Sequence, residues 1–242
     1  MEEAIRAAAA ASVLLVGSDY DGTLAPIVDD PELAHPDPMA IAALRHLVDL
    51  PDTHVAIISG RARGVLARLM GPIPGAVLVG GHGAEWEDQE ISPAATALAA
   101  RLGEVAARYP GALMESKPTG AAFHYRNVDP ALADGAAEAA LAAGTELATR
   151  VVHGKLIVDF TTSRSDKGSA LQRLRQEIAP DVIVFIGDDV TDEDAWAALE
   201  PSDVGIAIGR PDTNARLHLG SQTEVASLLA DLVSHRIIAQ QG

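Results

Sequence analysis

The sequence predicts an α/β fold in which a doubly wound parallel sheet is interrupted by a smaller α+β module. Three observations lead to this prediction. Short apolar runs alternate with helix-like stretches, the runs end in small or acidic residues, and a different pattern replaces this alternation between residues 89 and 164. Short β-branched runs that are apolar on both faces are typical of parallel strands covered by helices on both sides. Their alternation with helices favours right-handed crossovers within one open, Rossmann-like sheet.

Five runs are the expected strands of this sheet. They are VLLVGSD, HVAIISG, AVLVGG, DVIVFIGDD and VGIAIG, which end at residues 19, 60, 81, 189 and 209. Residues 36–50 and 166–178 have the apolar spacing of helices that cover a sheet. Ligands of doubly wound sheets bind beyond the carboxyl ends of the strands, and three of those ends carry Asp19, Ser59 and Asp188.

The middle of the chain is expected to form a module of its own. Ser92-Pro93 and Asp129-Pro130 each pair a capping side chain with a first-turn proline, which predicts the starts of two helices. The expected strands of the module lie around Pro118-Thr119-Gly120 and around His153-Gly154. This order predicts an α+β module over residues 89–164, inserted into a core made of residues 1–88 and 165–242.

Composition limits the partners and the chemistry. Only 3% of the 242 residues are aromatic although 48% are hydrophobic, so Ala, Val, Leu and Ile must fill the core. The formal net charge of −16 disfavours nucleic acid and anionic membranes as partners, and an anionic substrate needs a locally positive or metal-loaded site. The absence of cysteine excludes disulfides, thiolate zinc sites and cysteine nucleophiles. Without a basic leader or a long apolar run, we expect a cytoplasmic protein.

Two aspartates stand two positions apart at the end of the first expected strand. Asp19 and Asp21 begin the stretch DYDGT, which continues with Gly22 and Thr23. An Asp-Gly pair is also ordinary turn chemistry. Like charges at the mouth of a buried strand, however, repel each other and are difficult to desolvate, so they need a cation or a shared proton.

Three further stretches place polar side chains at strand ends or helix starts. They are ISGR with Ser59, Gly60 and Arg61; SDKG with Lys167; and GDDVTDEDA with Asp188, Asp189 and Asp192. Each has a simple structural interpretation alone: a turn, a solvated lysine, and an acidic helix start favoured by the helix dipole. Their occurrence together, in this order, favours a shared site.

The four stretches together resemble the haloacid-dehalogenase-like phosphatase superfamily, whose motifs are D-x-D-G-T, a strand-end Ser or Thr, a downstream Lys, and G-D-D. The resemblance implies a cap inserted between the Ser and Lys motifs. It also implies that Asp19 is the nucleophile of an aspartyl-phosphate mechanism and that Asp21 is the general acid and base. Mg²⁺ would be held by Asp19, by a backbone carbonyl near Asp21 and by Asp188.

The remaining motif residues are expected to surround the phosphate. Ser59, Thr23 and Lys167 would hold its oxygens, while Asp189 and Asp192 would orient the metal ligands. We expect four further residues at the phosphate and substrate site: Gly22, Gly60, Arg61 and His82.

Six stretches, DGTLAPI, SGR, GGHGAEW, ESK, HYR and GDDVTDEDA, are similar to the trehalose-6-phosphate phosphatase family. The similarity implies that Glu115 and Lys117 of the cap bind sugar hydroxyls. Charged side chains form strong hydrogen bonds to hydroxyls, although two charges two apart are also typical of a solvent-facing strand. His82 and Glu85 are expected near the cleft, and His124 and Arg126 as supports.

One segment departs from the pattern of that family, in which G-K-x-x-x-E is followed by an apolar residue, Arg and Pro. Here Gly154 and Lys155 are followed by Asp159, then by Phe160-Thr161-Thr162. Asp159 is expected where the sugar-binding Glu would be, with a side chain one methylene shorter.

The sequence therefore predicts a Mg²⁺-dependent phosphatase of a sugar phosphate, with trehalose 6-phosphate as the first candidate. A sucrose-phosphate-like, glycosyl-glycerate or cyclitol-containing phosphate stays open because of Asp159. Two other classes are a phospho-accepting receiver domain, which would be about half this length and lack a cap, and a catalytically inactive relative, which would not need the intact motif aspartates. The oligomeric state is left open.

Overall fold

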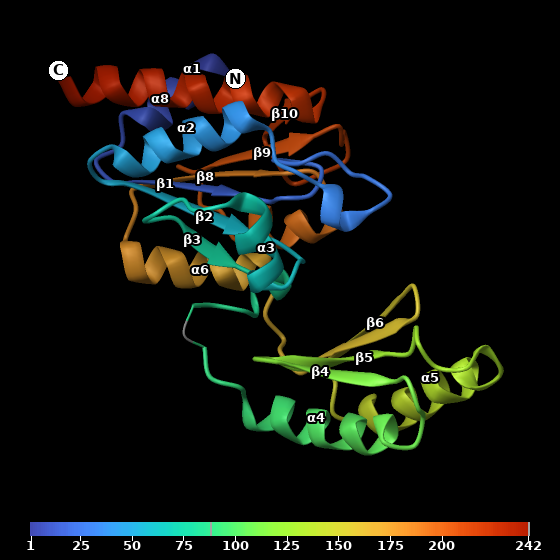
Figure 1. Ribbon diagram of the computed structural model, residues 1–242. Helices are drawn as coiled ribbons and strands as arrows, with labels where there is room; N and C mark the ends of the chain where they lie inside the picture. Colours follow the sequence, from blue (N-terminus) through green and yellow to red (C-terminus); the bar gives the residue numbers. More distant parts are fainter. Residues whose placement is uncertain (88, 242) are drawn as a thin grey trace. The chain divides into compact units, whose positions relative to one another are not determined.

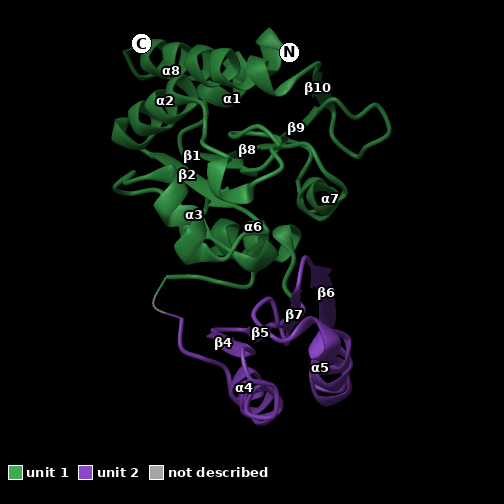
Figure 2. Cartoon of the chain, turned by 45° about the vertical axis from the view of Figure 1, so that its right-hand side comes forward, with its two compact units in different colours: residues 1–87, 165–242 green, residues 88–164 purple. Residues whose placement is uncertain are grey.

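The computed structural model describes residues 1–87 and 89–241 and divides the chain into two compact units. One unit is made of Met1–Glu87 and Ser165–Gly242, and the other of Asp88–Arg164 (Figure 2). The first boundary between the two units falls after residue 87, one residue before the boundary expected at 88/89. We call the two parts the core unit and the small unit.

The core unit contains a six-stranded parallel sheet, so the predicted α/β class is confirmed (Figure 1). Its strands, in the order β10-β9-β8-β1-β2-β3, are Leu217–Leu219, Val204–Ile208, Val182–Gly187, Leu14–Ser18, Thr53–Ile58 and Val77–Val79. The first of these, β10, was not predicted, because three residues at a sheet edge with an exposed His218 give no clear apolar run.

Helices bury both faces of this sheet, as the doubly apolar strands require. The helices of the core unit are α1 Glu2–Ala9, α2 Pro38–Asp49, α3 Arg63–Met70, α6 Lys167–Ile178, α7 Glu193–Ala197 and α8 Val225–Gln241. Val16 of β1 packs in one cluster with α1, α2 and α8, whereas its neighbour Leu15 packs in the other with α6 and α7. Short 3₁₀ turns span Pro31–Leu33, Gly81–Gly83, Val190–Asp192 and Gln222–Glu224.

Local capping places the start of α6. The carboxylate of Asp166 accepts a hydrogen bond from the backbone N–H of Ser169 at 2.7 Å, and the Ser169 hydroxyl accepts one from the N–H of Asp166. This capping box fixes Lys167 as the first helical residue. The side chain of Lys167 is buried at the carboxyl edge of the sheet instead of being solvated.

The small unit is a four-stranded antiparallel sheet with two helices. Its strands, in the order β4-β5-β7-β6, are Leu113–Lys117, Gly120–His124, Ile157–Thr161 and Arg150–Gly154, and its helices are α4 Pro93–Ala106 and α5 Pro130–Gly144. Ser92 and Asp129 cap the two helices as predicted. Phe123, Val158 and Phe160 lie in one buried cluster with residues of both helices. The opposite face of the sheet carries polar side chains together with the exposed apolar residues Leu113 and Val152.

No helix in the described residues is long and apolar enough to cross a membrane.

Candidate active site

The sequence motifs of the core unit meet at the carboxyl ends of β8, β1 and β2, which are neighbours in the sheet. A cavity of about 560 Å³ opens there. Eight of the predicted site residues line it: Asp19, Asp21, Gly60, Arg61, His82, Lys167, Asp188 and Asp189. Ile27, Val28, Pro31 and Thr191 also line it and were not predicted, since no periodic pattern marks residues of short 3₁₀ turns and loops.

Lys167 lies between two buried carboxylates. Its Nζ is 2.9 Å from Oδ1 of Asp19 and 2.7 Å from Oδ1 of Asp192, and only 1% of the side chain is exposed. Burial alone lowers the pKa of Lys167, but the two carboxylates outweigh it and the pKa is raised above its ordinary value. Lys167 is therefore a fixed positive charge in an otherwise acidic site.

The site makes the charged form of two carboxyl groups unfavourable. Burial, reinforced by the charge of Asp192, raises the pKa of Asp19 to about 7 although Lys167 opposes it. Burial and Asp192 likewise raise the pKa of Asp188 to about 6, against a hydrogen bond from Thr23. Such a site gains from a bound cation that removes the repulsion between the carboxylates.

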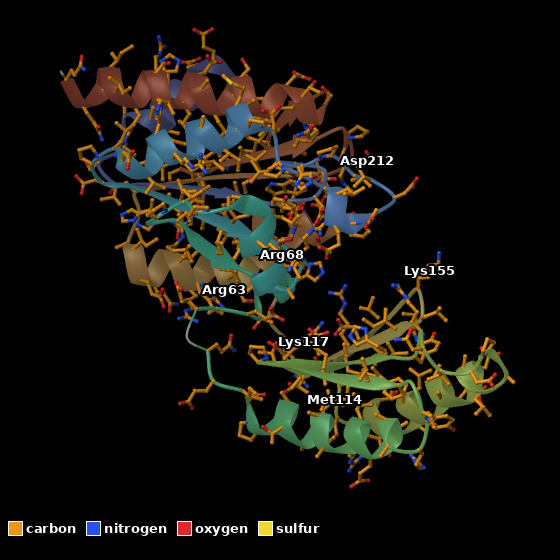
Figure 3. All side chains as sticks on the ribbon, viewed as in Figure 1. Arg63, Arg68, Met114, Lys117, Lys155 and Asp212 are labelled. Atoms are coloured by element: carbon orange, nitrogen blue, oxygen red, sulfur yellow. The ribbon has the colours of Figure 1, made fainter. Side chains whose placement is uncertain are left out.

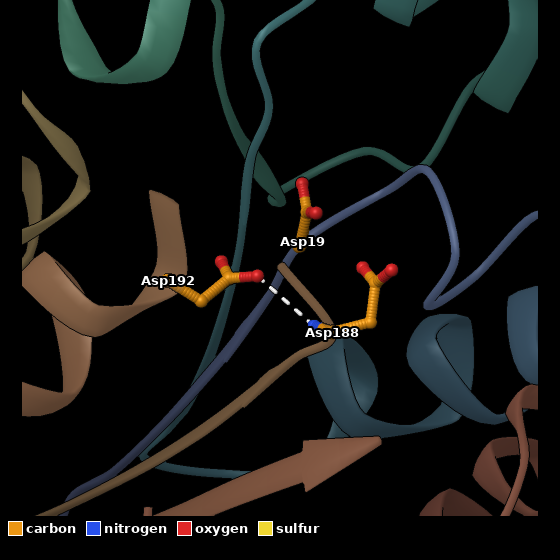
Figure 4. A group of neighbouring side chains, drawn as sticks. All are labelled: Asp19, Asp188 and Asp192. Atoms are coloured by element: carbon orange, nitrogen blue, oxygen red, sulfur yellow. Dashed lines mark hydrogen bonds between the residues drawn. The ribbon is translucent and has the colours of Figure 1, made fainter. Parts of the chain in front are cut away.

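The donor atoms present suit a hard cation. One carboxylate oxygen from each of Asp19, Asp188 and Asp192 lies within 4.8 Å of the others (Figure 4). The Asp192 oxygens already bind Lys167 and the backbone N–H groups of Asp188 and Asp189, the latter two at 3.0 and 2.9 Å. Oxygen ligands of this kind suit Mg²⁺, and Asp19 and Asp188 keep the freer oxygens. The third carboxylate orients its neighbours.

The carboxylate of Asp21 is turned to Arg61 instead of to this cluster. Nε and Nη2 of Arg61 donate to its two oxygens at 2.7 and 2.6 Å. The ligand expected from this residue is its backbone carbonyl, so the pairing leaves that expectation untested. The guanidinium of Arg61, expected near the phosphate, is directed at a carboxylate.

Gly22 and Thr23 shape the position of Asp188. A Cβ on Gly22, whose φ is +76°, would lie 2.0 Å from Oδ2 of Asp188, so only glycine fits there. The buried Thr23 hydroxyl donates to Oδ1 of Asp188 at 3.2 Å. Thr23 thus contacts Asp188. The contact with a phosphate oxygen that the sequence suggested for Thr23 stays a prediction.

The ISGR motif builds a tight turn beside the cavity. The buried Ser59 Oγ accepts a hydrogen bond from the backbone N–H of Arg61 at 3.1 Å. A Cβ on Gly60 would lie 2.4 Å from the ring of His82, which packs against this turn. Glu85, expected near the cleft, is buried and accepts a hydrogen bond from the N–H of Arg63 at the start of α3.

Asp189 and Asp192 both hold the turn that follows β8. Asp189 accepts a hydrogen bond from the N–H of Val190 at 2.6 Å. Asp192 is fully buried and accepts from the two N–H groups described above. Their contacts therefore fix the backbone that carries Asp188.

In the small unit, the predicted sugar-binding residues share one face of the sheet. Glu115 pairs with Ala122 in the strand register and Ala122 pairs with Asp159, so the two carboxylates stand in one row. Lys117 of β4 (Figure 3) forms an ion pair with Asp159. Glu115 is 2.8 Å from Nε2 of His124, and Arg126 follows the end of β5; the supporting roles expected of both stay predictions.

The model of the trehalose-phosphatase family matches residues 18–222 of the chain. The chain belongs to this family. The match spans all four motifs of the core unit and the whole small unit, so the predicted resemblance is confirmed.

Relatives with assigned names agree with the family. The chain is 34% identical over 242 residues to the trehalose-phosphate phosphatase of Mycobacterium marinum, covering 89% of this chain and 60% of that protein. It is 33% identical over 229 residues to a bifunctional trehalose-6-phosphate synthase/phosphatase of Thermoproteus tenax, covering 88% of this chain and 31% of that protein. The chain thus spans less than two thirds of the length of these relatives.

Solved structures of the family have the same fold. The trehalose-6-phosphate phosphatase of Aspergillus fumigatus aligns with a TM-score of 0.66 and 26% identity over 97% of both chains. The C-terminal domain of the Candida albicans enzyme aligns with a TM-score of 0.65 over 96% of both chains, and at 24% identity it supports the fold alone. The trehalose-phosphatase family therefore accounts for both units of this chain.

Proposed function

We propose that this chain is a Mg²⁺-dependent phosphatase that hydrolyses a phosphorylated disaccharide, with trehalose 6-phosphate as the leading substrate. The observation that carries the proposal is the buried Asp19, which lies 2.9 Å from Lys167 and within a carboxylate cluster at the cavity. A buried carboxylate beside two others is costly unless a bound cation and a substrate make use of it. Family membership supplies the reaction class.

In the proposed reaction, an oxygen of Asp19 attacks the phosphorus while the bond to the sugar oxygen breaks. Asp21, which for this step must be protonated on one of the two oxygens that otherwise accept from Arg61, gives that proton to the departing sugar oxygen, which leaves as a hydroxyl. The product on the enzyme is an aspartyl phosphate. Asp21 then takes a proton from water, whose oxygen attacks the same phosphorus and restores the Asp19 carboxylate with release of phosphate.

The other groups of the site would stabilise charge. A magnesium ion bound by Asp19 and Asp188 would neutralise the phosphoryl oxygens. Lys167 keeps its positive charge beside the nucleophile, so it reduces the repulsion between Asp19 and an incoming dianion. Gly60 and His82 line the cavity, and the buried Ser59 hydroxyl holds the turn beside them.

The polar face of the small unit is proposed to select the sugar. Glu115, Lys117 and Asp159 stand on one sheet face and offer charged hydrogen-bond groups for hydroxyls. The ion pair between Lys117 and the short Asp159 favours a second candidate as well: a related phosphorylated disaccharide whose hydroxyls suit this spacing. The cytoplasmic location expected from the sequence stays a prediction.

The deciding experiment is a phosphate-release screen over a panel of sugar phosphates, ranked by kcat/KM, with and without Mg²⁺. We expect trehalose 6-phosphate to rank first and the chelated protein to be inactive. A different phosphorylated disaccharide at the top would replace the substrate and keep the mechanism. No phosphate release from any member of the panel would refute the proposed function.

A further inference from the structure

Arg61 is the best-connected cation at the edge of the cavity, and its guanidinium is directed at Asp21. The two side chains form a bidentate pair, with Nε to Oδ2 at 2.7 Å and Nη2 to Oδ1 at 2.6 Å. The side chain of Arg61 is 12% exposed, compared with 38% for Asp21. A two-point pair of this kind sets the orientation of a carboxylate as well as its position.

Other contacts hold the guanidinium itself in place. Nη1 donates to the carbonyl oxygen of Pro31 at 2.8 Å, and the guanidinium carbon lies 5.4 Å from the centroid of the Tyr20 ring. Tyr20 is in turn buried, and its hydroxyl donates to the carbonyl of Ala34 at 2.6 Å. Each of the three guanidinium nitrogens therefore already donates to a protein acceptor.

This arrangement differs from that of Lys167, the other cation at the cavity. Lys167 contacts Asp19, the proposed nucleophile, whereas Arg61 contacts Asp21, the proposed proton donor. From these contacts we propose that Arg61 is a positioning residue that fixes the Asp21 carboxylate for proton transfer, and that it is not a ligand of the phosphate. The inference rests on the proposed phosphatase function.

The choice of leaving group separates the two roles. A sugar or alkyl alkoxide leaves poorly without a proton, whereas p-nitrophenolate leaves readily without one. A residue that acts through the proton donor therefore matters for release of the leaving group from alkyl phosphates and little for its release from p-nitrophenyl phosphate. Hydrolysis of the aspartyl phosphate, in which Asp21 is the base, is common to both substrates, so the first step is measured by itself. A ligand of the phosphate matters equally for both.

The test compares Arg61→Gln and Arg61→Lys with the wild type in Mg²⁺. We expect Arg61→Gln to lower the single-turnover rate of leaving-group release from the sugar phosphate by about 30–300-fold, and that from p-nitrophenyl phosphate by less than about threefold, with little change in KM. Arg61→Lys keeps the charge but makes only one contact, so its loss on the sugar phosphate is intermediate. Far-UV circular dichroism and thermal melting confirm that each variant is folded.

Arg68→Gln is the matched control. Arg68 lies on α3 (Figure 3) and forms an ion pair of 2.5 Å with Glu32, the residue after Pro31. Arg68 thus links the 3₁₀ turn that begins at Pro31 to α3, without contacting Asp21. Its rates on both substrates are expected to stay within about twofold of the wild type.

A double variant supplies the decisive comparison. If Arg61 acts through Asp21, Arg61→Gln lowers sugar-phosphate turnover by less than about threefold once Asp21→Asn is present. Two outcomes would overturn the positioning role. One is that the losses caused by Arg61→Gln and Asp21→Asn multiply fully in the double variant; the other is that Arg61→Gln lowers the rates on both substrates equally and raises KM.

The wild-type rates distinguish this failure from failure of the proposed function. A protein that cleaves p-nitrophenyl phosphate and another alkyl phosphate, but not trehalose 6-phosphate, refutes only the proposed sugar, and the Arg61 variants are then tested on that alkyl phosphate. A protein that cleaves only the aryl phosphate overturns the positioning role, and a protein that cleaves neither overturns the function as well.

Discussion

A cation is buried at each edge of the core sheet, and the two have opposite surroundings. At the carboxyl edge, Lys167 faces the carboxylates of Asp19 and Asp192. At the amino edge, where β1 and β2 begin, Arg236 of α8 faces neutral oxygens and is 2% exposed. Its acceptors are the carbonyls of Ala9, Ala11, Ser12, Pro51 and Asp52 and the hydroxyl of Thr53.

The neutral partners of Arg236 and the acidic partners of Lys167 indicate different roles for the two residues. Burial lowers the pKa of Arg236, weakly opposed by Asp52, whereas the carboxylates beside Lys167 raise the pKa of that lysine. Arg236 joins the segments that precede two central strands and satisfies their carbonyls, which stabilises the fold. Lys167 instead lies among acids that are costly to bury, an arrangement typical of functional sites.

The largest effect is expected at the carboxyl edge, from Asp19→Asn. Removal of the attacking oxygen should lower kcat by at least about 10⁴-fold, since a covalent nucleophile has no substitute in the site. The melting temperature should change little, because the variant also removes a buried charge. Steady-state phosphate release and thermal melting measure the two quantities. Near wild-type turnover would refute the role of Asp19.

Removal of the metal is expected to have the next largest effect. EDTA should lower phosphate release by more than about 100-fold, and added Mg²⁺ should restore it, because the acidic cluster needs a cation to receive a phosphate dianion. Asp188→Asn should raise the Mg²⁺ concentration for half-maximal activity by at least about tenfold. Activity that persists in a chelator would contradict a metal at Asp19 and Asp188.

At the amino edge, Arg236→Met should affect stability alone. The change leaves several buried carbonyls without donors, so we expect a loss of about 3–5 kcal/mol in the free energy of unfolding, measured by urea denaturation. The kcat per folded molecule should stay unchanged. Arg68→Met, at a half-exposed ion pair on α3, is the control and should cost less than about 1 kcal/mol. A large fall in kcat with intact stability would end the proposed contrast between the two edges.

The two edges also differ in how far the sequence predicts them. Asp19 and Asp188 were predicted to meet, because polar residues at the ends of strands lie at one edge of the sheet. Lys167, at a helix start, was placed beside them by the occurrence of the four motifs together. Arg236 was not predicted, since a lone arginine in a helix is usually solvated and its acceptors are more than 180 residues away along the chain. The bidentate partner of Arg61 was missed for the same reason: it lies 40 residues earlier.

The small unit shows the same limit. Alternation along β4 places Glu115 and Lys117 on one face, which the sequence alone indicates. Their partners depend on the register of β5 and β7, which brings Asp159 beside Lys117 and His124 beside Glu115. Strand register is determined by tertiary packing and turns, so no local pattern predicted these pairs.

Lys117 of the small unit is a third cation to compare with Lys167 and Arg236, and its ion pair with Asp159 is partly exposed. Glu115→Ala and Lys117→Ala should each lower kcat/KM on the preferred disaccharide phosphate by about 10–1000-fold, since unpaired polar groups replace the hydrogen bonds to hydroxyls. Hydrolysis of p-nitrophenyl phosphate should change by less than about threefold. Asp159→Glu should be tolerated, or improve turnover, if the substrate is trehalose 6-phosphate. Equal losses on both substrates would assign these residues to folding or to the chemical step.

The smallest effect is the pH dependence of stability in the metal-free protein. The pKa of Asp188 is raised to about 6 in the folded protein, above its ordinary value of 3.8, so the folded state binds this proton more tightly than the unfolded state. The resulting stability is present at low pH and is lost as the pH rises through about 6. Asp188→Asn has no charge to bury, so in EDTA at pH 8 it should melt roughly 2–4 °C above the wild type, on the order of 1 kcal/mol.

This advantage of Asp188→Asn should shrink as the pH falls toward 5, because the wild-type carboxyl group becomes neutral. Mg²⁺ should reverse the order at pH 8, since the ionised carboxylate then has a cation to bind and the asparagine does not. Asp212→Asn, at an exposed aspartate of the same unit, is the control and should follow the wild type at every pH. A constant difference between Asp188→Asn and the wild type from pH 5 to 8 would show that burial of this charge does not oppose folding. The carboxyl edge would then be as well adapted to stability as the amino edge.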